Sequence, residues 1–432
     1  MSPTFRALEV RNYRIYAAGA FVSNIGTWMG AIAQNWLVLT ELTDHSSQAL
    51  GLVVGLQFLP FVVLAPFTGM IADRYPKRRI LLATQSFMGS LMLLTSILVF
   101  TGTIRLWMMF VMAALLGSAM AIDNPARQTI VSEMVPIDTL ANAVALNSAS
   151  FNAGRLIGPG VAGLAIAQWG TGLAFLLNAI SFLAVIAALS TLRPGEMLPT
   201  PLARGRGAIR DGFAYVKRRR DIQLVMLLVF VFGTFGMNFQ ITTALMATTV
   251  FGKGPTEFGI LGSVVAIGSF TGALMSARRG TARLRTLLLA LSGFTVASTA
   301  AALAPSYVTF AVLLVVLGFT ALTALTTANA MVQTRVDPLL RGRVMALYMA
   351  IFMGGTPVGA PIIGWIGDVF GARWTIGIAP VAIGITLIGV AISLMRSENV
   401  RVSFETQPRP RLLISSEPVR SRVTEPVLEE AQ

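Results

Sequence analysis

The sequence contains no cysteine and a single histidine. The absence of cysteine excludes disulfide bonds, zinc thiolate sites and a cysteine nucleophile. The one histidine, His45, lies in the polar stretch Thr43-Asp44-His45-Ser46, which we interpret as a loop without a metal or catalytic role. A membrane-embedded enzyme would need a nucleophile, a metal cluster or paired carboxylates, and no acidic residue falls clearly in the middle of an apolar run. We therefore predict no enzyme, no metal and no cofactor.

Charge is also scarce. Only 12% of the residues are charged, whereas soluble domains carry about 25%. Hydrophobic residues make up 55% of the chain, and the mean hydropathy is +0.72. The net charge of +14 could indicate nucleic acid, but the bases lie in short clusters between apolar runs, which suits an anionic membrane face better. The sequence predicts an integral membrane protein whose partner is the lipid bilayer and not nucleic acid.

The apolar runs number twelve when each helix is given about 20 residues. They cover residues 13–39, 50–72, 80–101, 106–123, 140–168, 171–192, 222–249, 257–277, 286–304, 308–330, 343–368 and 374–395. The basic stretch 193–221 divides six runs from six, and the proline-containing stretch from 397 has little apolar periodicity. We predict a six-helix bundle over 1–192, a cytoplasmic linker over 193–221, a second bundle over 222–396 and a disordered cytoplasmic tail over 397–432.

The distribution of bases predicts the orientation. If the N-terminus is inside, the inner segments hold 29 of the 33 Lys and Arg residues, and the outer loops hold only Arg105, Lys253 and Arg373. This asymmetry satisfies the positive-inside rule. We expect a multi-pass protein of the cytoplasmic membrane with both termini in the cytoplasm.

The two halves repeat one another. A shift of 201 residues superimposes the fifth run on the eleventh and aligns four glycine pairs: Gly154 with Gly355, Gly158 with Gly359, Gly163 with Gly364, and Gly170 with Gly371. Small residues let helix backbones approach closely. Six plus six spans with a parallel repeat is a transporter layout, whose site lies between the halves near the middle of the membrane. The predicted fold is all-α, with twelve transmembrane helices in two pseudo-symmetric halves.

Several motifs resemble those of the major facilitator superfamily. Gly69-x-x-x-Asp73-Arg74 followed by Lys77-Arg78-Arg79 resembles the signature between helices two and three, although Pro76 stands where that family often has glycine. The segment 154–163 resembles the fifth-helix motif of drug-exporting antiporters. Two further stretches, 123–128 and 5–14, are similar to the enterobactin-exporter-like and bacterial drug-efflux branch. The resemblance spans roughly residues 5–395 and implies the major facilitator fold.

The resemblance implies two sets of functional residues. Those expected to gate the conformational change are Gly69, Asp73, Arg74, Arg78, Arg79, Asp123, Arg127, Gly158 and Pro159. In the family the acid of the first motif faces the start of helix eleven, which here lies near Arg341-Gly342-Arg343. A topology signal needs only bases, so an acid at Asp73 points to a mechanistic role, whereas Lys77, Arg78 and Arg79 could serve topology alone.

The second set would contact substrate or a coupling ion. Arg155 is the one base inside a predicted span, where a charge is costly and points to function; a structural pairing or snorkelling is the alternative. The polar residues on the helices that line the cavity in this family are Asn24, Gln34, Asn238, Gln240 and Asn329. Each could instead bond to a neighbouring helix.

The sequence thus predicts a secondary active transporter that exports small amphipathic molecules, such as drugs or siderophore-like compounds, by alternating access. Proton coupling follows from the resemblance alone, because no mid-span carboxylate is visible in the sequence. Import of a small metabolite on the same fold and a non-transporting receptor are the alternatives. The glycine-proline motif of helix five favours export, and the short outer loops disfavour a receptor. We expect a monomer.

Overall fold

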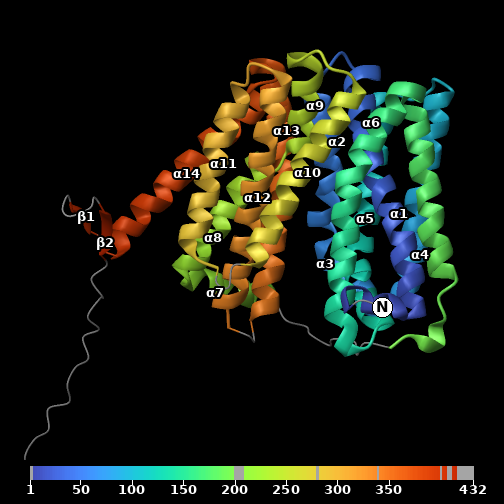
Figure 1. Cartoon of the computed structure of the whole chain (residues 1–432), viewed down its shortest axis with the longest axis horizontal. Coiled ribbons are helices and arrows are strands. Elements are labelled where there is room, and N and C mark those ends of the chain that lie inside the picture. The colour runs from blue at the N-terminus through green and yellow to red at the C-terminus, as the bar shows by residue number, and fades with distance from the viewer. Residues whose placement is uncertain are drawn as a thin grey trace, which may run out of the picture. The chain divides into compact units, whose positions relative to one another are not determined.

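The computed structural model describes residues 3–198, 209–278, 282–337, 340–398, 401–405 and 411–415, and most of them are helical (Figure 1). The chain forms two compact units, Met1–Ile383 and Gly384–Gln432. The first unit holds eleven of the twelve predicted spans and the beginning of the last. The border between these units is therefore not at the predicted linker, and the division into two bundles at 193–221 stays a prediction.

The first half of the larger unit begins with a short 3-10 helix, η1 (Pro3–Glu9). Its helices follow in order: α1 (Arg11–Trp36), continued by the π-helix η2 (Leu37–Glu41), α2 (Ser47–Val63), α3 (Ala65–Arg74), α4 (Lys77–Phe100), α5 (Leu106–Met134) and α6 (Ile137–Ser190). The predicted second span is split into α2 and α3 at Leu64. A proline follows in the first turn of α3, where its missing N–H costs no hydrogen bond.

The second half begins after the 3-10 turn η3 (Pro194–Glu196). Its helices are α7 (Ile209–Arg218), α8 (Arg220–Val231), the π-helix η4 (Phe232–Gly236), α9 (Phe239–Leu245), the π-helix η5 (Met246–Val250), α10 (Pro255–Ala277), α11 (Leu284–Ala302), α12 (Tyr307–Arg335), α13 (Arg341–Phe370) and α14 (Trp374–Glu398). Helix α7 lies within the predicted linker, so at least ten residues of that segment are helical. Gly212 of α7 packs on the backbone of Arg343 at the start of α13.

The described helices bear out the all-helical membrane fold. Nine of them are long and apolar enough to cross a membrane, and α6 covers both the fifth and the sixth predicted spans. Helices α1 and α2 correspond to the first and second predicted spans but are not among the nine. The exact number of twelve therefore stays a prediction.

The internal repeat reappears as equivalent packing. Gly163 on α6 lies against Pro255 and Thr256 at the start of α10, and Gly364 on α13 lies against Ser47 at the start of α2. In the next pair, Gly170 breaks α6 between its two spans and Gly371 follows the end of α13. Their φ angles are 80° and 94°, a backbone conformation that glycine adopts without a steric penalty from a Cβ atom. Glycines that align in sequence thus do the same structural work in both halves.

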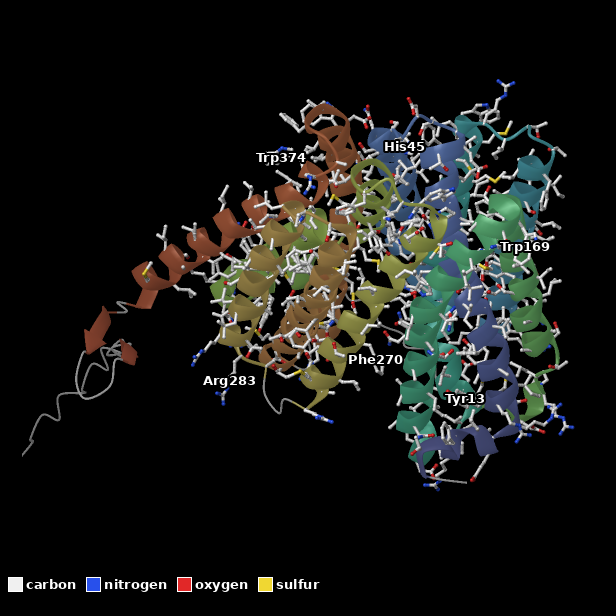
Figure 2. All side chains as sticks on the ribbon, turned by 45° about the horizontal axis from the view of Figure 1, so that its top comes forward. Tyr13, His45, Trp169, Phe270, Arg283 and Trp374 are labelled. Atoms are coloured by element: carbon white, nitrogen blue, oxygen red, sulfur yellow. The ribbon has the colours of Figure 1, made fainter. Side chains whose placement is uncertain are left out.

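A buried apolar cluster stabilises one end of the first half. Tyr13 of α1 lies within it and donates a hydrogen bond of 2.7 Å to the carbonyl of Ala143 on α6 (Figure 2). Close by, the side chain of Asn12 pairs with both backbone groups of Arg193, at 3.1 Å each. These contacts fix the start of α1 on α6, so the first half is held together at the end that carries the N-terminus.

The smaller unit contains the only part of the tail that the structure describes beyond α14. Strands β1 (Arg401–Glu405) and β2 (Arg411–Ser415) pair antiparallel, with Ser403 opposite Leu413. Ten residues of the predicted tail thus form a short hairpin, and the disorder of the rest of the tail stays a prediction. The remaining tail residues lie outside the described part of the chain.

Candidate functional site

The most deeply buried charge of the first half, Asp123, lies on α5. Asp123 and Arg127 form an ion pair of 2.8 Å, and the Asp123 side chain is only 5% exposed. Their spacing of four residues places them on one face of the helix. The predicted fourth span ends at 123, but α5 continues to Met134, so Asp123 lies inside a helix long enough to cross the membrane and not at its end. The prediction that the fourth helix ends at Asp123 is therefore wrong.

Helix α4 supplies further partners to this carboxylate. The Thr84 hydroxyl and the Gln85 amide donate to Oδ1 of Asp123 at 2.6 and 2.7 Å, and both side chains are buried. A buried charge is tolerated only when it is paired and hydrogen-bonded. With Arg127 on its other oxygen, Asp123 satisfies that condition. Thr84 and Gln85 were not predicted, because nothing local in the sequence links them to α5.

The network continues to α1 and α6. Arg127 donates to Oδ1 of Asn24 at 3.4 Å, and the Asn24 amide donates to the Ser150 hydroxyl at 3.2 Å. Asn24 also lies against Gly154. Three predicted residues, Asn24, Asp123 and Arg127, thus come together in one chain of polar contacts that joins four helices.

Arg155 lies nearby on α6 with a different environment. Its guanidinium carbon is 5.5 Å from the ring centre of Trp28 on α1, and Trp28 in turn makes an edge-on contact with Phe151, with ring centres 5.8 Å apart. Among the described residues no carboxylate pairs with Arg155. Trp28 was not predicted, and an aromatic residue on an apolar helix carries no distinguishing signal in the sequence.

The glycine-proline motif of α6 contacts one helix of its own half, α1, and one helix of the other half, α10. Gly158 lies on the backbone of α1 at Ile25 and on Trp28. Pro159 lies under Gly259 of α10. One turn away the Ser263 hydroxyl of α10 donates to the Leu156 carbonyl at 2.6 Å. The motif therefore forms a contact between α6 and the other half, where gating is predicted.

The remaining predicted polar residues do not gather with these. Gln34 bonds to Gln57 of α2 at 3.1 Å, and Asn238 donates to the Thr234 carbonyl, leaving its own buried oxygen without a partner among the described residues. Asn329 accepts from Gln333 one turn further along α12, and Gln240 is half-buried with no hydrogen bond to a described residue. No bond joins any of these four predicted residues to another.

The basic turn between α3 and α4 is partly structural. Lys77 pairs with Glu133 of α5 at 2.6 Å, with both side chains only 13% exposed. Arg78 donates to the carbonyls of Leu189 and Ser190 at 2.6 and 2.8 Å, which are unpaired at the end of α6. Two bases of the motif therefore hold the first half together in addition to any topological role.

The other members of this motif make fewer contacts. Gly69 has open space where a side chain would stand, Arg74 lies 6.0 Å from the Tyr75 ring, and Arg79 is exposed. Asp73 lies in α3, but its side chain is outside what the structure describes. The predicted contact of Asp73 with the start of α13 therefore stays a prediction.

At the opposite end a carboxylate that was not predicted joins the two halves. Asp368, near the end of α13, accepts hydrogen bonds from the backbone N–H groups of Ser47 and Gln48 at 2.7 and 3.2 Å. It also accepts from the hydroxyls of Ser47 and Ser46 at 2.5 and 3.1 Å. These donors are the first turn of α2, whose positive dipole end favours a negative charge.

Glycines bring the same helices into close contact. Gly51 and Gly55 of α2 lie against Ala360 and Pro361 of α13. The symmetric contact, α6 on α10, has equally close glycines but lacks the acid, since Ala167 occupies the position that corresponds to Asp368. Ser46 and Ser47 precede an apolar run, which is a signal for the start of a helix. The sequence cannot show that Asp368, 321 positions after Ser47, completes the cap.

A family model described as transmembrane secretion effector matches residues 2–424 of this chain. The staphyloferrin A transporter of Staphylococcus aureus is 28% identical over 387 residues, which cover 87% of this chain and 94% of that protein. The enterobactin exporter EntS of Shigella flexneri is 22% identical over 403 residues, which cover 91% and 93%. The crystal structure of the nucleoside transporter NupG aligns with a TM-score of 0.72 at 12% identity, covering 88% of this chain and 99% of that chain; this likeness shows the fold alone.

Proposed function

Since the chain belongs to the transmembrane secretion effectors of the major facilitator superfamily, we propose that it exports small amphipathic molecules, such as drugs and siderophore-like compounds, by alternating access. The chain is a multi-pass membrane transporter of small molecules and not an enzyme. The predicted likeness to the enterobactin-exporter branch is confirmed. Export is supported by the similarity to an enterobactin exporter and by the glycine-proline motif of α6, and the substrate class is supported by the similarity to siderophore transporters.

The observation that carries the proposal is that helices of the two halves are in close contact at the end where Asp368 lies. There Asp368 caps α2, and glycines bring α2 onto α13 and α6 onto α10. We propose that this end faces outward and opens when the other end closes. The motif residues at the other end, Gly69, Asp73, Arg74, Arg78 and Arg79, would stabilise the alternative state. Gly158 and Pro159 would act as part of the α6–α10 contact.

The orientation rests on the base distribution, with 29 of 33 bases in the inner segments. We propose that both termini and residues 193–221 are cytoplasmic. Reporter fusions at about residues 45, 205 and 425 test this arrangement. Cytoplasmic signals at 205 and 425 and an external signal at 45 are expected; an external signal at 205 would overturn the twelve-span arrangement.

We propose that Asp123 and Arg127 take part in the conformational change. Their ion pair is bonded to Thr84 and Gln85 of α4 and to Asn24 of α1. Since Asn24 also lies against Gly154 of α6, a rearrangement of this pair would reach helices that border the other half. Gln34, Asn238, Gln240 and Asn329 are the further candidates for substrate contact, and we propose that the transporter acts as a monomer.

A susceptibility panel tests the function directly. Drugs and siderophores are tested on a deletion strain and an overexpressing strain, and accumulation is measured with and without a protonophore. Export predicts that the deletion strain accumulates more of at least one compound and that the protonophore abolishes the difference. An importer predicts less accumulation in the deletion strain. A receptor predicts no difference in accumulation.

A further inference from the structure

Arg155 is a cation without a counterion in the middle of a helical span. It lies 18 residues after the start of α6 and 15 before the break at Gly170. Its guanidinium makes no hydrogen bond or ion pair to any described residue, and its one assigned interaction is with the Trp28 ring at 5.5 Å. By contrast Arg127, the other base well inside a helix, is neutralised by Asp123. A charge held in this way is retained for something other than packing.

Three acids on the helices of the membrane part are already engaged. Asp123 is bonded to α4 and to Arg127, Asp368 caps α2, and Glu41 at the end of η2 accepts two hydrogen bonds from Thr171 at 2.8 and 3.0 Å. Each of these carboxylates would lose its own partners by turning to Arg155. The charge of Arg155 is therefore available to a group that does not belong to the protein.

The side chains around Arg155 indicate which kind of ligand would carry the group that binds this charge. Trp28 presents the face of an indole, and Phe151, which is 48% exposed, extends this apolar surface one turn away on α6. A guanidinium offers a planar fork of N–H donors that matches a carboxylate. A ligand that satisfies both features has an anionic group beside a flat apolar ring system.

We propose that Arg155 and Trp28 form a binding site for the anionic group of the transported molecule, and that the transporter prefers aromatic or otherwise flat amphipathic anions to cations of the same skeleton. This inference rests on the proposed function, since it names the class of its substrate. The position aligned with Arg155 in the second half is Thr356. The repeat therefore does not require a base, and the charge belongs to a single site.

The test uses two xanthene dyes of similar shape and opposite charge, 6-carboxyfluorescein and rhodamine 6G. Binding to the purified full-length protein in nanodiscs is measured by fluorescence anisotropy for the wild type, Arg155→Ala, Arg155→Lys and Trp28→Ala. Lys253→Gln is the matched control, because Lys253 is also a cation beside an aromatic ring, 6.0 Å from Tyr307, but lies outside the spans. Transport of both dyes into inside-out membrane vesicles is measured in parallel.

We expect the wild type to bind the anionic dye more tightly. Arg155→Ala should weaken that binding by about 10- to 100-fold, the loss typical of a hydrogen-bonded charge pair, and leave the cationic dye unaffected. Arg155→Lys should recover part of the affinity, Trp28→Ala should weaken binding of the anion less than Arg155→Ala does, and Lys253→Gln should match the wild type. Equal weakening of both dyes in Arg155→Ala, or a wild-type preference for the cation, would overturn the proposed site. Anion binding that depends on Arg155 without transport in either direction would support the site and contradict the exporter.

Discussion

The Asp368 cap predicts a measurable shift in the conformational equilibrium. Asp368→Asn removes the charge that accepts four hydrogen bonds from the first turn of α2 but keeps one acceptor oxygen. Hydrogen bonds to a charged group contribute about 1.5–3 kcal/mol and a carboxylate at a helix N-terminus about 0.3–1 kcal/mol. Because Asp368 is exposed, we expect a net loss of about 1–2 kcal/mol from the state in which this end is closed.

That loss lowers the ratio of closed to open molecules at this end by about 5- to 30-fold. The protein contains no cysteine, so pairs of spin labels can be introduced without removing native thiols. A pair at Arg105→Cys and Leu303→Cys reports on the Asp368 end, and a pair at Ile137→Cys and Arg283→Cys reports on the other end; all four positions are exposed. In Asp368→Asn the first pair should gain longer distances and the second pair shorter ones.

Asp44→Asn is the control for the loss of a negative charge. Asp44 is an exposed carboxylate in the connection between η2 and α2, and it makes no hydrogen bond or ion pair to a described residue. Its removal should leave both distance distributions as in the wild type. Unchanged distributions in Asp368→Asn, or the same change in Asp44→Asn, would refute the view that this cap holds the two halves together.

Three further outcomes are expected. Asp123→Ala should destabilise the protein by about 3–5 kcal/mol, because Arg127 is left as a partly buried charge without its counterion. The double variant Asp123→Ala with Arg127→Leu should unfold at a higher temperature than the single variant in thermal melts. Asp73→Asn should insert normally but transport at least severalfold more slowly; wild-type accumulation in that variant would leave Asp73 without a mechanistic role. Gly259→Val should prevent α10 from approaching Pro159 and lengthen the distance between labels on α6 and α10, whereas an unchanged distance would show that this contact does not require glycine.

Patterns along the chain predicted the helices and their repeat well, because both are local or periodic. The apolar runs, interrupted by short basic turns, marked the helices, and the glycines in register marked where helices pack. Asp123 and Arg127 were both predicted as gating residues. Their ion pair and its burial were not predicted, since the predicted span ended at the acid and the helix continues for eleven residues beyond it.

Contacts between distant segments could not be predicted from the sequence. Asp368 and Ser47 are separated by 321 positions, and neither residue type alone indicates a cap that joins two halves. Lys77 was interpreted as a possible topology signal, and its pair with Glu133 became evident only when the ends of α4 and α5 were placed side by side. The polar residues Gln34 and Asn329 were selected for a shared cavity, but each finds a partner nearer by, because a polar group within a helix bundle bonds to the first available neighbour.

Direction of transport is the central claim, and vesicles of defined orientation test it most directly. A compound to which the deletion strain is hypersensitive is offered to energised inside-out and right-side-out membrane vesicles from cells that overproduce the protein, with vesicles from the deletion strain as the background. Accumulation in the inside-out vesicles alone, abolished by a protonophore, is the result that export predicts. Accumulation in the right-side-out vesicles alone would identify an importer and contradict the proposed function.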